Sequence, residues 1–182
     1  MAQTIIDSPI GALFLDASDK GLRLMSFLGG TKHTSLVEGL PEQPVAPRGP
    51  ADELLEEARR QLNAYFAGDL RRFDLPLDVK GSPFRRRVWE AIASIPFGQT
   101  ASYAEVAAMA GAPNAYRAAG SACGANPTAV IVPCHRVVGS DRNLHGFGGG
   151  LNTKVWLLRH EGALAAIRPS YAAEFAGQPA LV

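Results

Sequence analysis

In the first half of the chain, short apolar runs are separated by polar breaks. Residues 11–17 and 21–27 are two such runs joined by a short polar turn, which predicts a β-hairpin. Residues 51–67 place apolar side chains at helical spacing and are followed by Gly68, which predicts an amphipathic helix packed on a small sheet. Residues 40–50 hold four prolines and predict a loop or linker. The apolar positions of the helix are Leu54, Leu55, Ala58, Leu62, Tyr65 and Phe66.

Helix start signals are denser in the second half. Ser82 and Pro83 form a cap followed by a first-turn proline, and the apolar stripe that follows ends before residues 96–98. Ser102 and Glu105 have the spacing of a capping box, which predicts a short helix as far as residue 110. The first of these helices carries its apolar stripe on Phe84, Val88, Trp89 and Ile92.

A third helix in this half is built from unusually small residues. Asn114 is placed to cap it, and residues 115–122 are mostly alanine and glycine. Two short helices joined by a tight glycine-containing turn predict helix-turn-helix geometry. Small side chains bury little area but permit close approach, so the helix packs on another helix or faces a large partner such as DNA. The residue pattern leaves both interpretations open.

The composition of the 182 residues, 47% apolar and 19% charged, is that of a globular protein. No apolar run approaches the ~18 residues of a membrane-spanning helix, and residues 1–4 lack the basic flank of a signal peptide. We therefore expect a cytoplasmic protein with no membrane partner. Only two cysteines are present, which excludes a disulfide framework and a four-cysteine zinc site.

The net charge of +1 is the sum of two unlike halves. Residues 1–79 hold 8 Lys/Arg and 12 Asp/Glu, whereas residues 80–165 hold 9 and 4, so the balances are −4 and +5. Such asymmetry is consistent with nucleic-acid contact by the second half, although a solvated surface explains it equally well.

The candidate reactive centre is the segment around Cys134. Residues 129–132 are an apolar run that predicts a buried strand leading into Cys134, His135 and Arg136. Positive neighbours lower the pKa of a thiol, and the thiolate is the nucleophilic form. Adjacent side chains of a strand point to opposite faces, so cysteine and histidine can cooperate only across a turn or through a water. Glu161 is the leading candidate to orient the imidazole, and an inert buried thiol is the alternative.

The sequence context of Cys134 resembles one family, the O6-alkylguanine-DNA alkyltransferases, also called methylated-DNA-protein-cysteine methyltransferases. The similarity extends through residues 80–162 and is fainter in the first half, at residues 8–11 and 62–68. The matching segments are Pro133-Cys134-His135-Arg136-Val137-Val138, Gly146-Phe147-Gly148-Gly149-Gly150, Lys154, Leu157-Leu158, Glu161-Gly162, residues 84–89, residues 95–100, Ser102-Tyr103, Arg117-Ala118-Ala119-Gly120 and Asn126-Pro127.

The resemblance implies an α/β fold in two domains. Residues 1–79 would form an N-terminal ribonuclease-H-like α/β domain, and residues 80–165 a winged helix-turn-helix that binds DNA and carries the reactive site. Residues 166–182 would be a tail, and we expect poor order in it. The implied activity is DNA repair by direct reversal, in which an alkyl group moves irreversibly from guanine O6 to the protein's own cysteine. Thymine O4 remains open as a second substrate.

The family resemblance also assigns roles to residues around the cysteine. Cys134 would accept the alkyl group, His135 would take its proton through a water, and Glu161 would hold the imidazole. Asn126 resembles the family's hinge residue between the recognition helix and the reactive segment. The protein would act once per molecule, without metal or organic cofactor.

Further residues would bind the damaged base and the duplex. The Tyr103 hydroxyl would donate to N3 of the flipped guanine, while backbone groups of Cys134, Val137 and Gly148 read the base edge. Arg117 resembles the arginine that fills the gap left in the duplex. The partner would be double-stranded DNA containing O6-alkylguanine, entered through the minor groove by a monomer, with clustering on DNA left open. The expected DNA contacts are Arg117, Ala118, Ala119, Gly120 and Arg136.

One departure from the family pattern concerns the base pocket. Phe147 stands where most relatives have tyrosine, which keeps the ring as a wall but removes a hydroxyl. Gly148 leaves that wall slim, which suggests room for alkyl groups larger than methyl. Cys123 is interpreted as a packing residue rather than a redox partner. His33 and His145 are interpreted as solvated loop residues.

Two other classes of protein compete with this interpretation. An alkyltransferase-like binding protein would flip the base without transfer, but such relatives replace the cysteine and lack a front domain. A thiol hydrolase with a cysteine-histidine-glutamate triad would leave the helix-turn-helix unexplained and shows no obvious oxyanion loop.

Overall fold

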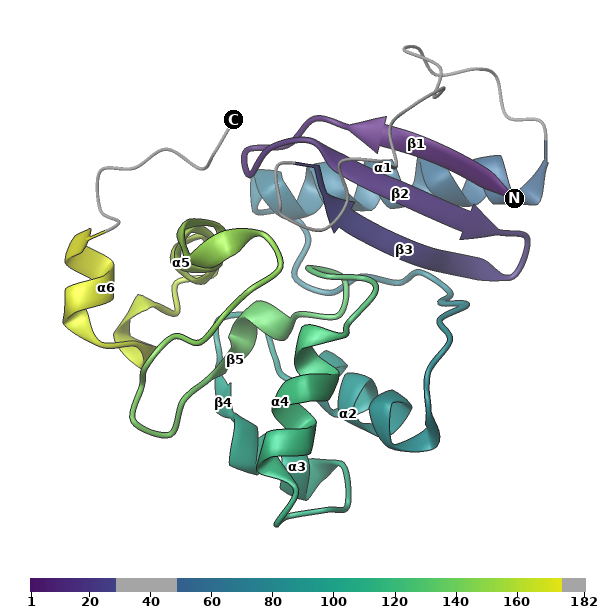
Figure 1. The fold of residues 1–182 in the computed structure, drawn as a ribbon. Helices are drawn as coiled ribbons and strands as arrows, with labels where there is room; N and C mark the ends of the chain where they lie inside the picture. The colour runs from purple at the N-terminus through teal and green to yellow at the C-terminus, as the bar shows by residue number, and fades with distance from the viewer. Residues whose placement is uncertain (29–48, 175–182) are drawn as a thin grey trace.

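The computed structural model describes residues 1–28 and 49–174 of the chain. Its first part is an antiparallel sheet in the order β1-β2-β3 (Figure 1). The strands are β1 (Ala2–Ile6), β2 (Leu13–Ser18) and β3 (Gly21–Phe27). The expected hairpin is confirmed, since β2 and β3 pair along their whole length. Strand β1 adds an edge to the expected pair, and its weak alternation of apolar and polar residues hides it in the sequence.

Helix α1 (Pro50–Ala67) lies across one face of this sheet (Figure 1). It has a proline in its first turn and ends at Gly68, whose φ of 88° is left-handed backbone that glycine adopts without strain. The helix is amphipathic as predicted, and it packs on the sheet through a buried stripe. The expected linker at residues 40–50 lies outside the described part of the chain except for its last two residues, of which Pro50 already belongs to α1; His33 also lies outside it. The buried residues of the helix are Ala51, Leu55, Ala58, Gln61, Leu62 and Tyr65.

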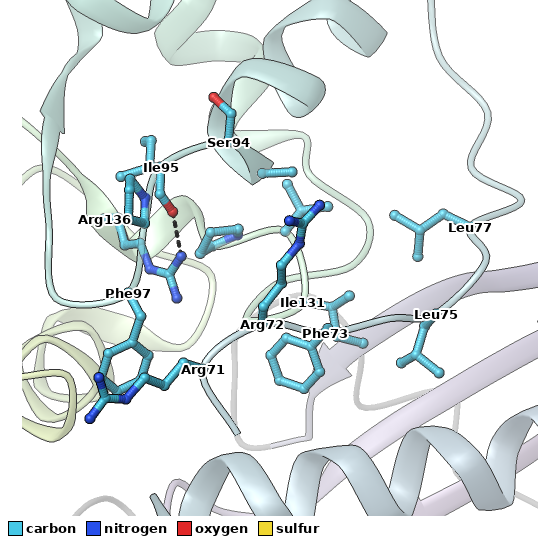
Figure 2. A pocket seen from close by; sticks show the side chains of 14 residues that line it. Arg71, Arg72, Phe73, Leu75, Leu77, Ser94, Ile95, Phe97, Ile131 and Arg136 are labelled. Carbon is cyan, nitrogen blue, oxygen red and sulfur yellow. Dashed lines mark hydrogen bonds between the residues drawn. The ribbon is translucent and has the colours of Figure 1, made fainter. Parts of the chain in front are cut away.

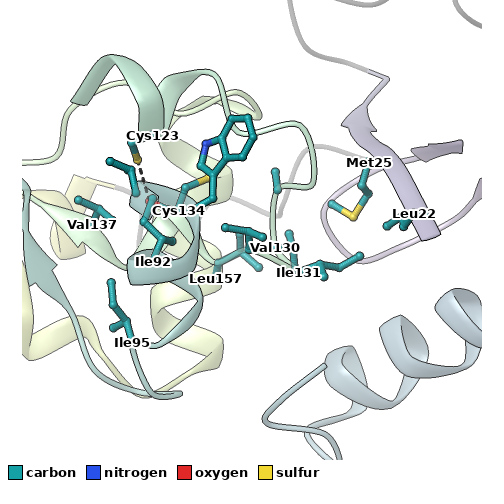
Figure 3. Packing of buried hydrophobic residues seen from close by; sticks show 14 of the residues in the cluster. Leu22, Met25, Ile92, Ile95, Cys123, Val130, Ile131, Cys134, Val137 and Leu157 are labelled. Atoms are coloured by element: carbon teal, nitrogen blue, oxygen red, sulfur yellow. Dashed lines mark hydrogen bonds between the residues drawn. The ribbon is translucent and has the colours of Figure 1, made fainter. Parts of the chain in front are cut away.

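The outer edge of β3 joins the first half of the chain to the second. The Met25 amide donates to the carbonyl oxygen of Pro127 at 2.8 Å, and Met25 forms an isolated β-bridge with Thr128. One cluster of buried apolar side chains continues from the sheet into the second half, where Ile131 and Leu157 belong to it (Figure 3). The two halves therefore share a core rather than meeting only at a polar surface.

The second half contains the predicted helix starts. Ser82 caps α2, and Ser102 and Glu105 form the predicted capping box of α3 in both directions. Helices α3 and α4 pack on each other around a tight turn, which gives the helix-turn-helix geometry (Figure 1). The indole N–H of Trp89 donates to the carbonyl oxygen of Ala122 at 2.9 Å and ties α2 to α4. These helices are α2 (Pro83–Ala93), α3 (Tyr103–Met109) and α4 (Tyr116–Gly124).

Two local expectations are wrong. The N-cap of α4 is Ala115, without a side-chain cap, so Asn114 does not cap this helix. Residues 129–132 form a turn instead of a strand: the Val132 amide donates to the carbonyl oxygen of Thr128 at 2.8 Å, and Val130 has a φ of 68°. The run is apolar because it packs in the shared core, and burial alone does not distinguish a strand from a buried turn.

The reactive segment follows this turn and leads into a pair of short parallel strands. The 3-10 helix η2 (Cys134–Arg136) leads directly into β5 (Val137–Val138), which pairs in parallel with β4 (Ala101–Ser102) at the start of the helix-turn-helix. Helix α5 (Gly150–His160) then packs against η2. Both neighbours of the reactive segment are therefore fixed by regular structure.

The chain beyond residue 163 continues with two short helices as far as residue 174, a part of the chain for which the sequence predicts only a tail. It forms η3 (Leu164–Ala166) and α6 (Pro169–Glu174). Ile167 is buried in a second apolar cluster with Val138 and Leu158, so this segment is anchored by packing. Residues 175–182 lie outside the described part. Among the described helices, none is long and apolar enough to cross a membrane.

The two glycines that end α1 and α4 provide a matched test of backbone strain. A Cβ would meet no atom within 4 Å at Gly68 or at Gly124, but only Gly68 has a left-handed φ. We expect Gly68→Ala to lower the free energy of unfolding by about 1 kcal/mol, and Gly124→Ala to leave it unchanged or raise it by up to ~1 kcal/mol. Urea denaturation measures both values. Equal losses in the two variants would contradict this assignment of strain.

Candidate active site

The reactive cysteine lies in a turn rather than at the end of a strand. Cys134, His135 and Arg136 occupy the single turn of η2, and all three side chains are buried. The predicted obstacle, that adjacent strand residues face opposite ways, therefore does not arise, because the chain turns at these residues. Cys134 contributes to the shared core beside Cys123, Ile92 and Val137 (Figure 3).

Cys123 is in contact with the reactive cysteine. Its thiol lies 3.9 Å from the main-chain oxygen of Cys134, within the range for a weak sulfur hydrogen bond. The neighbouring Cys123 thiol, acting on the Cys134 side chain, is the main cause that the pKa of Cys134 lies below its ordinary value; burial opposes this shift, while Asn126 and the charge of Lys154 support it. The pKa of Cys123 is raised, so this residue stays a thiol. Cys123 thus packs as expected but also acts on its neighbour.

Lys154 is a buried cation whose electrostatic role the sequence did not reveal. Only 1% of it is exposed, and its Nζ donates to the carbonyl oxygen of Val137 at 2.7 Å. Burial lowers its pKa, and negative charge on the cysteine sulfurs would raise it. Within the described residues no carboxylate forms an ion pair with Lys154. A thiolate at Cys134 would therefore supply the missing negative charge.

His135 is placed to act as a base. Its Nε2 lies 2.7 Å from Oε1 of Glu161, as the sequence predicts for this pair, while Nδ1 has no hydrogen-bond partner among the described residues. Burial lowers the pKa of His135 more than Glu161 raises it, so the ring is neutral at neutral pH. The tautomer inferred from this network carries the proton on Nε2 and leaves the Nδ1 lone pair free.

The Glu161 carboxylate accepts hydrogen bonds from several parts of the chain. Arg136 donates to it through Nε at 2.8 Å and Nη2 at 3.0 Å, the Tyr65 hydroxyl donates at 2.7 Å, and the Gly98 amide donates at 3.3 Å. Burial alone would raise the pKa of Glu161, but the hydrogen bonds and charges of His135 and Arg136 lower it well below its ordinary range. Glu161 is therefore an ionised group buried inside the protein.

Arg136 belongs to this network and not to the DNA surface, which corrects its expected role. Its side chain is only 6% exposed, and its remaining guanidinium nitrogen donates to the carbonyl oxygen of Ile95 at 2.6 Å (Figure 2). Arg136 also lines a cleft of about 720 Å³ together with Arg72 and Phe73. Cys134 and His135 do not line that cleft, so it is separate from the reactive centre.

Asn126 connects the end of α4 to the segment that precedes the cysteine. Its side-chain amide donates to the carbonyl oxygen of Val132 at 2.8 Å, and its Oδ1 accepts from the Thr128 amide at 3.1 Å. These two bonds hold the turn at residues 129–132 in place. Its position agrees with the expected hinge, and its role in transfer stays a prediction.

The residues of α4 that are expected to contact DNA differ in how exposed they are. Arg117 and Ala118 are exposed, with the Arg117 guanidinium over the ring of Tyr116. Ala119 is fully buried in the core, so the expectation that it contacts DNA is corrected. Gly120 is partly buried, and a Cβ there would come within 3.6 Å of the Tyr103 ring. The helix therefore offers one exposed face and packs with the other.

The predicted pocket residues differ in burial: Val137 is buried, Tyr103 and Phe147 are half-buried, and Gly148 is exposed. Burial, and after it the two cysteines, raise the pKa of Tyr103, which keeps its hydroxyl protonated as a donor. The Phe147 ring contacts those of Phe27 and His135 at centroid distances of 5.4 Å and 6.4 Å. A Cβ at Gly148 would meet nothing within 4 Å. The carbonyl oxygen of the buried Val137 accepts the hydrogen bond from Lys154. His145 is exposed, as expected, and its ring packs edge-on against that of Tyr103. Among the described residues, no group of three or more histidine, cysteine or acidic side chains is placed to hold a metal ion.

Comparison with known proteins gives consistent matches to both halves of the chain. Residues 1–79 match the family described as 6-O-methylguanine DNA methyltransferase, ribonuclease-like domain, and residues 83–163 match the family described as 6-O-methylguanine DNA methyltransferase, DNA binding domain. A methylated-DNA--protein-cysteine methyltransferase of Methanosarcina barkeri is 44% identical over 88% of this chain and 97% of its own length. One from Mycolicibacterium paratuberculosis is 47% identical over 86% and 89%.

Solved structures are similar as well. The crystal structure of Mycobacterium tuberculosis O6-methylguanine methyltransferase has a TM-score of 0.76 and 44% identity, over 88% of this chain and 92% of that one. The Mycobacterium tuberculosis OGT in complex with DNA has a TM-score of 0.72 and 44% identity, over 90% and 92%.

The buried carboxylate generates a prediction about stability. Replacing Glu161 by glutamine leaves the Arg136 cation buried without its counter-charge, and we expect a loss of roughly 3–5 kcal/mol in the free energy of unfolding at neutral pH. The matched control Glu57→Gln removes an exposed ion pair with Arg60 that solvent screens, so its loss of stability should be far smaller than that of Glu161→Gln.

The loss of stability caused by Glu161→Gln should depend on pH. A carboxyl whose pKa is lowered by folding stabilises the protein above its unfolded pKa of about 4.3, and this contribution disappears as the pH falls. The stability difference between wild type and Glu161→Gln should therefore narrow below about pH 4. Chemical denaturation at several pH values measures it, and a difference that stays constant into acid would show that Glu161 is not ionised in the fold.

Proposed function

The chain belongs to the 6-O-methylguanine DNA methyltransferase family and repairs DNA by direct reversal as a methylated-DNA-protein-cysteine methyltransferase; we propose that Cys134 is its alkyl acceptor. The observation that carries this proposal is the surroundings of the Cys134 sulfur. A buried cation, Lys154, and a thiol donor, Cys123, lower the pKa of Cys134, and the neutral imidazole of His135 follows it in the chain. This arrangement stabilises a thiolate, which is the nucleophilic form.

Transfer is a direct displacement at the alkyl carbon. The Cys134 sulfur forms a bond to that carbon while the bond from the carbon to guanine O6 breaks, and the guanine leaves with the electron pair. The thiol proton passes through a water to Nδ1 of His135, whose Nε2–H remains bonded to Glu161. The Tyr103 hydroxyl donates to N3 of the leaving purine and offsets the charge that develops on it. Because the product is a thioether, each molecule acts once, and the reaction needs no cofactor.

DNA is the partner, and we propose that α4 enters its minor groove. The small exposed residue Ala118 permits close approach, and the exposed Arg117 is long enough to occupy the space of an extruded nucleotide. An O6-alkylguanine pairs poorly, which reduces the cost of flipping it into the pocket beside Cys134. The balance of +5 in residues 80–165 favours phosphate contacts that do not depend on sequence. Action as a monomer, clustering on DNA, thymine O4 as a substrate and a cytoplasmic location stay predictions.

The direct test is alkylation of the protein by a damaged duplex. After incubation with DNA containing O6-methylguanine, the peptide that holds Cys134 should gain one methyl group, and intact mass should show a single addition. Cys134→Ala should bind the damaged duplex and transfer nothing, while Cys123→Ala should still be methylated at Cys134. Binding of damaged DNA without methylation of the wild type would support the alkyltransferase-like binding protein instead.

The pocket wall predicts tolerance of larger alkyl groups. Since Gly148 is exposed and a Cβ there would meet no atom within 4 Å, no side chain at this position limits the size of the alkyl group, and wild type should accept benzyl from O6-benzylguanine at a measurable rate. Gly148→Val fills this space, and we expect it to slow benzyl transfer at least tenfold more than methyl transfer, which corresponds to the cost of a steric clash of about 1.4 kcal/mol. Phe147→Tyr is the control that alters polarity and keeps the ring. A strict preference for methyl in wild type would show that the pocket is closed.

A further inference from the structure

The first half of the chain places one polar group directly at the reactive centre. Tyr65, in the last turn of α1, is fully buried, and its hydroxyl donates to Oε1 of Glu161 at 2.7 Å. The same oxygen accepts from His135 at 2.7 Å. We propose that Tyr65 is a positioning residue for alkyl transfer, a role that rests on the proposed function: it orients the carboxylate that orients the base.

The Tyr65 side chain is held firmly enough to do this. Its ring has edge or tilted contacts with four other rings at centroid distances between 5.1 and 6.2 Å. Its main-chain oxygen lies 2.7 Å from Nε2 of His160, the residue that precedes Glu161. The end of α5 is therefore attached twice to the same residue of α1, once at its backbone and once at its hydroxyl. The ring partners are Phe66, Phe73, Phe97 and His160.

Tyr65 can act only as a donor in this network. Burial first, and the charge of Glu161 after it, raise the pKa of the phenol far above its ordinary value. The hydroxyl is therefore protonated wherever the protein is folded, and its proton points at the carboxylate. A group that never ionises adds no charge to the buried site, in contrast to Arg136 and Lys154.

This donor has two effects on the imidazole. It fixes the carboxylate so that Oε1 faces Nε2 of His135, which keeps the proton on Nε2 and the lone pair on Nδ1. It also shares the negative charge of Oε1, so that Glu161 stabilises the imidazolium less and the ring stays neutral. The other groups that act on His135 are Arg136 and Lys154, which lower its pKa, and Glu161, which raises it. The imidazole ring of His135 receives its proton from the sulfur of Cys134, the residue that precedes it in the chain.

The test is Tyr65→Phe, which removes the hydroxyl and keeps the ring packing. With one donor fewer, Glu161 holds the imidazolium more strongly, so the pKa of His135 should rise and the acid limb of the pH–rate profile should move to higher pH. Methyl transfer from O6-methylguanine duplex should slow about tenfold at neutral pH, the effect of losing one hydrogen bond to a charged group. The measurement is the single-turnover rate at a series of pH values.

A matched control separates positioning from stability. Gln61 lies one turn earlier on α1, is buried, and hydrogen-bonds to the backbone of Asp74 without touching Glu161. Gln61→Ala should lower the free energy of unfolding but leave the acid limb where it is in wild type. An acid limb of Tyr65→Phe that coincides with that of wild type would overturn the proposal, whatever happens to its stability.

A second measurement does not depend on transfer. NMR of the imidazole nitrogens should show the Nε2–H tautomer of His135 in wild type and a higher His135 pKa in Tyr65→Phe. If wild type transfers no alkyl group but this pKa still rises, the proposed function fails while Tyr65 keeps its effect on His135. If transfer occurs and the pKa is the same in both proteins, Tyr65 has only a structural role and the positioning proposal fails.

Discussion

An ionised carboxylate buried at the junction of the two halves is the constraint on which the rest of this structure depends. Glu161 is 4% exposed, and such a charge is tolerated only when donors surround it. The donors come from separate places in the sequence: Tyr65 on α1, the Gly98 amide after α2, and His135 and Arg136 on η2. Satisfying one carboxylate therefore sets where α1, α5 and the reactive turn lie relative to one another.

The same arrangement prepares the chemistry. Because burial lowers the pKa of His135 more than Glu161 raises it, and the charge of Arg136 lowers it further, His135 remains a neutral imidazole beside a carboxylate, and its Nδ1 has no hydrogen-bond partner among the described residues. The pKa of Cys134 is lowered by Cys123 on α4 and by the charge of the buried Lys154 on α5. The proposed thiolate of Cys134 would lie in a buried site with little exposure to water, which suits a protein proposed to react once. The shared core holds both sets of groups in place.

Local signals in the sequence predicted much of this correctly. Features that depend on neighbouring residues could be predicted from the sequence. They are the hairpin, α1 with its terminal glycine, the Ser82 cap and the capping box of α3. The pairing of His135 with Glu161 also agrees with the sequence. Other features could not be predicted, because each depends on contacts between residues far apart in the chain. They are the turn at residues 129–132, the burial of Arg136 and the hydrogen bond from the Tyr65 hydroxyl to Glu161. The sequence alone does not show whether an apolar run forms a strand or a buried turn. Nor does it show whether an arginine lies in the core or faces DNA.

The central claim is that the Glu161 carboxylate organises the chemistry and does not merely hold the fold together. The most direct test is the double variant Glu161→Gln with Arg136→Met, which removes both buried charges at once. Replacing a buried ion pair by neutral groups can restore stability lost in the single variant. We predict that the double variant unfolds at a higher denaturant concentration than Glu161→Gln, while its single-turnover methyl transfer stays at least about tenfold slower than wild type. A transfer rate that recovers together with stability would contradict the account.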